Sequence, residues 1–377
     1  MDYKKKIESF TGLRFIMIST IIINHIYYLA FIDSIGHFYT KFFQNSIFAV
    51  NFFFILSGFG MMFGYLKRCP DSEVVFPSII SNIKYAINHI KKIYPVYLFA
   101  IRIGLIFLII STIQKSEMSS SFVFREFIRL IIHCLLLQSA TCMTFFTHAY
   151  NGVSWFISSL FCIYLISPFL MTLLRKISKS YYVSLALIVF NIVTILILFK
   201  LFGQFELFIQ NKGISKVDNL VYGSPYIRVF YVLIGMNAAL FFNQIENKIQ
   251  TVSQTFFSII EILISLITII YYFSRNSLTP AYYDFRPLMD ILLPAMIIVI
   301  FSFDKGCISN KLKNPKIQLL GNMSMYFYLI HPIFIIQLSL LLENHITWSL
   351  LTAFFYTILS IALTFIISLL FYKNSKK

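Results

Sequence analysis

The chain has 377 residues, of which 58% are hydrophobic and 12% are charged, and its formal net charge is +16 at pH 7. A soluble domain carries about twice that charged fraction, so the composition excludes an ordinary soluble protein. The basic residues lie in short clusters between apolar runs, as in the cytoplasmic loops of membrane proteins, which argues against nucleic-acid binding. The five cysteines have neither metal-site nor redox spacing, so no metal site is predicted.

Apolar runs of about twenty residues predict an all-α, polytopic membrane bundle. The fourth run is short and carries Arg129 and His133, so we expect it to be re-entrant or interfacial and the other ten to span the membrane. With both termini cytoplasmic, this arrangement places most basic clusters inside. The chain is therefore interpreted as one domain, 1–377, with a short basic cytoplasmic tail at 373–377. The runs lie near 11–32, 43–66, 93–113, 126–141, 153–174, 181–202, 226–243, 255–274, 287–303, 318–342 and 347–372.

The first predicted span contains Arg14 and His25, eleven positions apart. Eleven steps are close to three helical turns, so both side chains project from one face, roughly 16 Å apart along the axis. Ionisable residues at membrane depth are costly and mark functional sites by default. The alternative is that Arg14 reaches toward the headgroups and His25 bonds a neighbouring helix.

Further polar residues recur in or beside the later spans. Cations at 89–97 lie at a membrane interface, where they are suited to bind the phosphates of a nucleotide-like donor. His331 precedes Pro332, which frees backbone groups for local polar contacts, although a core histidine bonded to a neighbouring helix fits equally well. Trp155 is also typical of packing or interfacial anchoring, and Arg228 of either an anchor or a site residue. Glu261 and Asp290 are interpreted as structural polar pairs.

Six stretches, taken in order, resemble the acyltransferase 3 family of integral membrane acyltransferases. The resemblance covers residues from about 10 to 333. The matching pieces are Arg14 with His25; Phe53-Phe54-Ile55-Leu56-Ser57-Gly58; Lys92-Ile93-Tyr94-Pro95-Val96-Tyr97; Trp155, Ser158, Tyr164 and Pro168; Arg228 with Gly235; and Gly321, Ser324, Tyr328 and His331.

The resemblance implies a ten-helix core in the inner (cytoplasmic) membrane, an acyl-coenzyme A donor used as substrate with no bound cofactor, and a glycan or lipid-linked glycan acceptor. It implies that His25 is catalytic and that Arg14 is its partner, at the donor site or as a structural residue. The implied substrate-binding residues are His89, Lys92, Ser57, Trp155, Ser158, Arg228, Tyr328 and His331.

Three positions depart from the family pattern. His89 and Lys92 stand where the family often has two arginines, which weakens a phosphate clamp because lysine cannot bind bidentately. Leu160 replaces a common acidic residue, so no carboxylate assists from that span. Asn51 stands where an aspartate is frequent.

Acyl transfer by these residues is chemically consistent even without the family resemblance. Transfer from a thioester needs a general base for a sugar hydroxyl and donors for the developing oxyanion. Burial disfavours the imidazolium, which suits His25 as a base. We therefore expect an O-acyltransferase, in particular an O-acetyltransferase of a cell-surface polysaccharide or its lipid-linked precursor. The alternatives are a lipid-linked glycan flippase or transporter, which would show internal repeats, and an outer-face glycan polymerase, which would carry a large outer loop.

Overall fold

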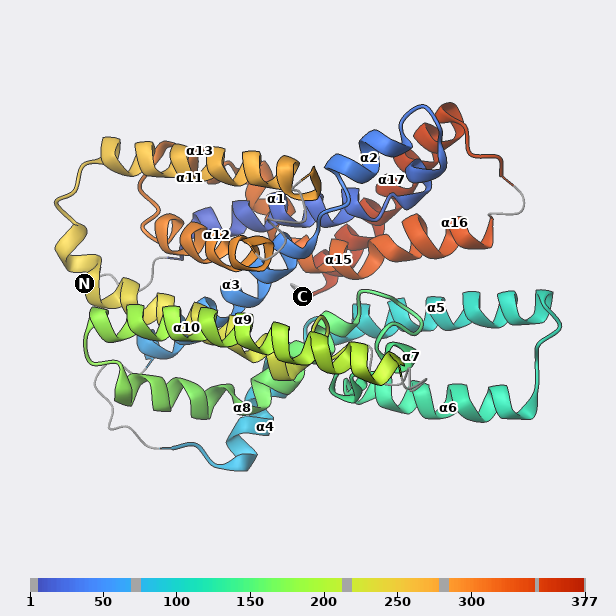
Figure 1. The fold of residues 1–377 in the computed structure, drawn as a ribbon, viewed down its shortest axis with the longest axis horizontal. Coiled ribbons are helices and arrows are strands. Elements are labelled where there is room, and N and C mark those ends of the chain that lie inside the picture. Colours follow the sequence, from blue (N-terminus) through green and yellow to red (C-terminus); the bar gives the residue numbers. More distant parts are fainter. Residues whose placement is uncertain (1–5, 69–75, 212–218, 278–284, 343–345, 376–377) are drawn as a thin grey trace.

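The computed structural model describes residues 6–68, 76–211, 219–277, 285–342 and 346–375, and within them it is all-helical. In Figure 1, α3 crosses the middle of the bundle obliquely, and α5 and α6 extend together to the right end of the view. The helices are α1 Glu8–Asn24, η1 Tyr27–Phe31, α2 Gly36–Phe42, α3 Ile47–Arg68, α4 Ile79–Ile90, α5 Tyr94–Gln114, α6 Ser120–Cys134, η2 Gln138–Thr141, α7 Thr144–Thr147, α8 Trp155–Ile177, α9 Tyr181–Asn211, α10 Pro225–Ile245, η3 Glu246–Ile249, α11 Gln254–Ser274, η4 Arg275–Ser277, α12 Phe285–Phe301, α13 Cys307–Leu312, α14 Pro315–Asn322, α15 Ser324–Pro332, η6 Ile333–Gln337, α16 Leu338–Leu341 and α17 Leu350–Asn374.

The predicted fold class is confirmed. Among the described residues, nine helical segments are long and apolar enough to cross a membrane. One of the ten predicted spans, 287–303, is not among these nine segments. It corresponds to α12, which has 17 residues and so extends about 26 Å. Of the predicted basic tail, Lys373 belongs to α17, whereas Lys376 and Lys377 lie outside the described residues.

The fourth apolar run forms α6, whose 15 residues are not among these nine segments. Its apolar side chains, such as Phe124 and Phe127, point outward, whereas Glu126 and His133 are buried. The chain that follows lies inside the protein, where Asn151 Nδ2 donates to the Leu329 carbonyl at 2.8 Å. Irregular backbone is tolerated at membrane depth only in such surroundings.

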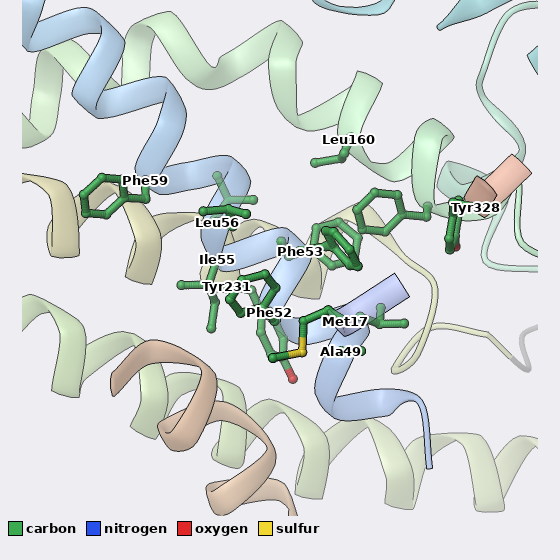
Figure 2. Close-up of a cluster of buried hydrophobic side chains, with 14 of the residues drawn as sticks. Met17, Ala49, Phe52, Phe53, Ile55, Leu56, Phe59, Leu160, Tyr231 and Tyr328 are labelled. Atoms are coloured by element: carbon green, nitrogen blue, oxygen red, sulfur yellow. The ribbon is translucent and has the colours of Figure 1, made fainter. Parts of the chain in front are cut away.

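The core is built around α3, which packs against α10. A Cβ at Gly58 would collide with the carbonyl oxygen of Val232, and one at Gly235 with that of Ile55, so both glycines permit the close approach of the two helices. Large side chains of α3 fill the rest of the interface. Figure 2 shows Phe52, Phe53, Ile55, Leu56 and Phe59 in one cluster with Met17, Leu160, Tyr231 and Tyr328.

The sequence predicted one continuous helix for the first span, but the structure does not have one. The α-helix ends at Asn24, His25 is its C-cap, and a 3₁₀ turn continues to Phe31. The reason is a cap from outside the helix: Tyr39 Oη donates to the carbonyls of Ile23 at 2.8 Å and Asn24 at 2.9 Å. The last carbonyls of a helix need such partners.

Two buried carboxylates tie helix ends together, as expected for structural polar groups. Asp290 pairs with Arg275, with Nη2 and Oδ2 2.7 Å apart. Glu261 lies at the N-terminus of α13, where its Oε2 accepts from the backbone N–H groups of Ile308 at 3.0 Å and Ser309 at 2.9 Å, and its Oε1 from that of Gly306 at 3.0 Å. A carboxylate is favoured at a helix N-terminus.

Glu261→Ala is expected to destabilise the fold by about 3 kcal/mol or more, because it leaves three buried N–H donors without an acceptor. Thermal unfolding in detergent measures the loss. Glu261→Gln retains one side-chain carbonyl acceptor and is expected to lose less. Equal unfolding temperatures for wild type and Glu261→Ala would contradict the capping role.

Candidate active site

The structure brings together two histidines from opposite ends of the sequence. His25 Nδ1 and His331 Nε2 are 3.1 Å apart, and the ring centroids are 5.1 Å apart. His331 is fully buried, whereas His25 is partly exposed. The backbone supports this contact on both sides, because α1 ends at His25 and α15 gives way to the π-helical turn η6 directly after Pro332. Such turns are frequent at functional sites.

The contacts define the proton positions of this pair. His331 Nδ1 lies 2.9 Å from the Phe327 carbonyl, which can only accept, so Nδ1 carries a proton. In the neutral ring Nε2 is then an acceptor, and it receives the Nδ1–H of His25. The Nε2 of a neutral His25 therefore carries a free lone pair. This is the arrangement of a general base oriented by a second group.

A cavity of about 370 Å³ lies on the Arg14 side of the pair and is called the cationic cavity below. It is enclosed by α1, α3, α4, α8, α14 and α15 and contains no carboxylate in its lining. The residues that line it are Arg14, Phe53, Leu56, Ser57, Gly60, Met61, Gly64, Arg68, Tyr85, His89, Ile90, Ile93, Phe156, Ile157, Leu160, Tyr164, Asn322, Ser324 and Met325.

Within the described residues, the lining of this cavity carries positive charge and no carboxylate. Throughout the described ranges, neither Arg14 nor Arg68 forms an ion pair with a carboxylate. Lys6 lies close by, with its Nζ 3.4 Å from Oδ1 of Asn322. Burial lowers the pKa of Lys6, and the charge of Arg14 lowers it further. Two arginines in a lining that holds no carboxylate are suited to a polyanionic ligand.

One wall of the cationic cavity consists of three rings in contact, tilted relative to one another. The His89 ring lies 4.0 Å from that of Tyr85 and 5.0 Å from that of Tyr164, measured between centroids. The Tyr85 hydroxyl is buried and has no hydrogen-bond partner in the described residues, which leaves it available to a ligand. Partial burial lowers the pKa of His89, and the charge of Arg68 lowers it further, so the ring is neutral near pH 7.

A small void borders the cationic cavity and lies near the histidine pair. A void of about 10 Å³ shares Phe53, Phe156, Ser324 and Met325 with the cationic cavity. It is also lined by Ile21, one turn before His25, and by Tyr328, whose ring centroid is 6.2 Å from that of His331. Its volume is about that needed for a single water molecule. Substrate passage therefore requires the side chains around the void to move.

Of the other predicted binding residues, Ser57, His89 and Tyr328 line these spaces, but Lys92 does not. Lys92 is exposed and absent from the cavity wall. Ser57 donates to its own helix at the Phe53 carbonyl at 2.7 Å. Tyr328 Oη donates to the Val153 carbonyl at 2.9 Å. The cationic end of the cavity is instead supplied by Arg68, which the sequence analysis did not single out.

Arg228, Trp155 and Ser158 lie in structural contacts away from the cavities. Ser158 Oγ donates to the Leu136 carbonyl at 2.8 Å and accepts from the Ser139 N–H at 3.0 Å. Arg228 is 1% exposed and donates to Asn51 Oδ1 at 2.6 Å and the Tyr222 carbonyl at 2.7 Å. Its guanidinium faces the rings of Phe54, Trp155, Tyr222 and Tyr231. The asparagine at position 51 thus binds a buried arginine.

Sequence reasoning missed Arg68, Tyr85 and the open floor of the cavity at Gly60. A Cβ at Gly60 would meet no atom within 4 Å, so this position faces the cavity space. The available signal was spacing: Ser57, Gly60, Gly64 and Arg68 recur at three to four residues and share one face of α3.

Comparison with known proteins gives one match. A family model described as an acyltransferase domain matches residues 7–373. No curated protein and no solved structure matches the chain.

Proposed function

Because the chain belongs to the acyltransferase 3 family over nearly its whole length and is thus an acyl-transferring membrane enzyme, we propose the specific reaction that follows. The protein transfers an acetyl group from acyl-coenzyme A to a hydroxyl of a cell-surface polysaccharide or its lipid-linked precursor. The enzyme resides in the inner membrane with both termini in the cytoplasm, so that the basic mouth of the cationic cavity meets the cytoplasmic donor.

The observation that carries this proposal is a carboxylate-free cavity with two arginines, together with an oriented histidine pair that lies near a small void bordering this cavity. Coenzyme A carries several phosphates on a long arm that ends in a thiol ester. Arg14, Arg68 and the Tyr85 hydroxyl offer donors for the phosphates. Movement of the side chains around the void beside Ile21 and Tyr328 would open a path for the thioester to His25.

The reaction balances with the groups present. His25 Nε2 takes the proton of the acceptor hydroxyl while its oxygen attacks the thioester carbonyl carbon. The tetrahedral intermediate breaks the C–S bond, and the His25 imidazolium returns the proton to the departing thiolate. His331 accepts the Nδ1–H of His25 throughout, which keeps Nε2 directed at the reactants.

Membranes that contain the protein, incubated with acetyl-labelled coenzyme A, test this function. We expect release of free coenzyme A and transfer of label to envelope glycan or its lipid-linked precursor. Membranes without the protein are the control. A flippase or a polymerase would leave the thioester intact, and that result would reject the proposal.

His89→Arg is expected to lower the KM for acetyl-coenzyme A severalfold, because a neutral imidazole is replaced by a permanent, bidentate cation. Because the pKa of His89 is lowered by burial, the ring is mostly neutral above pH 7, and the wild-type KM is expected to change little between pH 7 and 8. Initial-rate titrations measure both. Asn88→Arg, exposed on the same helix and outside the cavity, is the control. A wild-type KM that falls severalfold as the pH drops from 8 to 7 would contradict the neutral state.

A further inference from the structure

A buried serine lies where the cationic cavity borders the small void. Ser324 is the first residue of α15, and it lines both spaces. It is 6% exposed, and its hydroxyl has no hydrogen-bond partner in the described residues. Buried serines within helices usually donate to a carbonyl one turn back, as Ser167 does to Ile163 at 2.8 Å. The hydroxyl of Ser324 is therefore available to a ligand.

Two backbone donors accompany this hydroxyl. The first N–H groups of a helix have no acceptor within that helix. In α15, the N–H groups of Tyr326 and Phe327 donate to the Met323 carbonyl at 2.9 and 3.0 Å. Across the described part of the chain, those of Ser324 and Met325 have no such acceptor, and both residues line the cationic cavity. Unpaired donors beside a cavity indicate a ligand that offers an acceptor oxygen.

The remaining lining at this border is apolar. Phe53, Phe156 and Met325 line both the cavity and the void, as Ser324 does. The hydroxyl of Tyr328 also lines the void, but it donates to the Val153 carbonyl at 2.9 Å. A polar group that leaves water at this border costs free energy unless it finds a hydrogen bond. Ser324 supplies the side-chain donor for such a group.

Helix α15 connects this serine to the histidine pair. Seven residues separate Ser324 from His331, so the two lie on one face of α15, about 10 Å apart along its axis. Tyr328 lies between them on the same face, and its ring centroid is 6.2 Å from that of His331. A ligand bound at Ser324 is therefore held two helical turns from the histidine that orients His25.

This separation matches the arm of coenzyme A. The arm, pantetheine, joins the phosphates to the thiol and carries two amide groups. The amide carbon nearer the thiol lies five bonds from the thioester carbon, or roughly 6 Å when extended. The attacking hydroxyl lies between the thioester carbon and His25 Nε2 and adds a hydrogen bond of about 2.7 Å. With the thioester at His25, this amide falls at the level of Ser324.

We propose that Ser324 binds an amide carbonyl of the pantetheine arm and thereby places the thioester at the histidine pair. The hydroxyl donates to the carbonyl oxygen, and the unpaired N–H groups at the start of α15 lie beside it. The proposal rests on the proposed function. It narrows the donor class to thioesters of pantetheine, as opposed to nucleotides that carry the same phosphates alone.

Calorimetric titration of the purified full-length protein in detergent tests this contact with two ligands. Coenzyme A carries the arm, whereas 3′-phosphoadenosine 5′-diphosphate carries the same phosphates without it. Ser324→Ala is expected to weaken the binding of coenzyme A about three- to tenfold, the effect of one hydrogen bond, and to leave the binding of the armless nucleotide unchanged. Ser167→Ala, at a buried serine bonded to its own helix, is the control.

Because the hydroxyl of Ser324 has no partner within the described residues, Ser324→Ala should unfold at the wild-type temperature. Ser324→Cys keeps the size of the side chain with a weaker donor and should bind coenzyme A with intermediate affinity. It replaces the alanine variant if that variant does not fold. Wild-type affinity of Ser324→Ala for coenzyme A, or an equal loss for both ligands, would overturn the contact.

Turnover of acetyl-coenzyme A distinguishes this proposal from the proposed function. Ser324→Ala should raise the KM for the donor by the same factor, with little change in kcat. A loss confined to kcat would overturn the arm contact. If the wild type cleaves the thioester and Ser324→Ala does so with an unchanged KM, only the arm contact is rejected. Absence of thioester cleavage by the wild type would reject the proposed function instead.

Discussion

Alanine in place of His25 is expected to slow acyl transfer at least about a hundredfold, the usual contribution of a positioned general base. The protein should still fold, because His25 is partly exposed and its ring contacts His331 from the end of α1. Initial rates with acetyl-labelled coenzyme A, normalised to folded protein, measure the loss. His37→Ala, at an exposed histidine in α2, is the control.

His331→Gln separates positioning from catalysis in the same assay. Glutamine retains a carbonyl acceptor for the Nδ1–H of His25 but orients the ring less rigidly. We therefore expect a fall of about tenfold in kcat and an altered pH profile, with little change in the KM for the donor. A large change in donor KM alone would contradict the assigned contact. Full activity of folded His25→Ala would refute the general-base role.

The second large effect is expected at Arg14. Arg14→Ala removes a charge-assisted contact to a donor phosphate, worth about 1.5–3 kcal/mol, so the KM for acyl-coenzyme A should rise roughly 10- to 100-fold. Stability should be kept or improved, because a cation without a carboxylate partner is removed from the protein interior. Donor titrations and thermal unfolding in detergent measure both quantities.

Arg228→Ala provides the matched contrast for Arg14→Ala. Arg228 is bonded to Asn51 and to the Tyr222 carbonyl, so its loss leaves buried acceptors unpaired and should reduce the amount of folded protein. Arg14→Lys should retain part of the donor affinity. If Arg14→Ala were degraded while Arg14→Lys was fully active, Arg14 would be a topology anchor and not a ligand for the donor.

The membrane bundle was predictable because twenty-residue apolar runs and the placement of basic clusters depend only on local sequence. The alignment of Arg14 and His25 was predicted from helical periodicity, and α1 is helical from Arg14 to Asn24, one residue before His25. The end of α1 was not, because it depends on Tyr39, a hydroxyl from a neighbouring helix. The predicted span at 287–303, which corresponds to α12, is shorter than the nine other spanning segments.

The site was only partly predictable because it is assembled across the fold. His25 and His331 were both candidates, but their contact joins residues 306 positions apart. Basic residues at span ends give the least information about which residues form the site. In the sequence, Arg68 in the cavity wall and Lys92 outside it look alike. The roles predicted for Trp155, Ser158 and Lys92 in substrate binding remain predictions.

The constriction between the cationic cavity and the histidine pair has a bioenergetic consequence. An enzyme that admits a cytoplasmic substrate and an acceptor from the opposite leaflet risks becoming a leak for protons and ions. Phe53, Phe156 and Met325 surround a gap that holds about one water molecule, so among the described residues this gap admits no continuous file of water. In the energised membrane that the proposed function requires, this closed gap would limit proton leakage along the donor path.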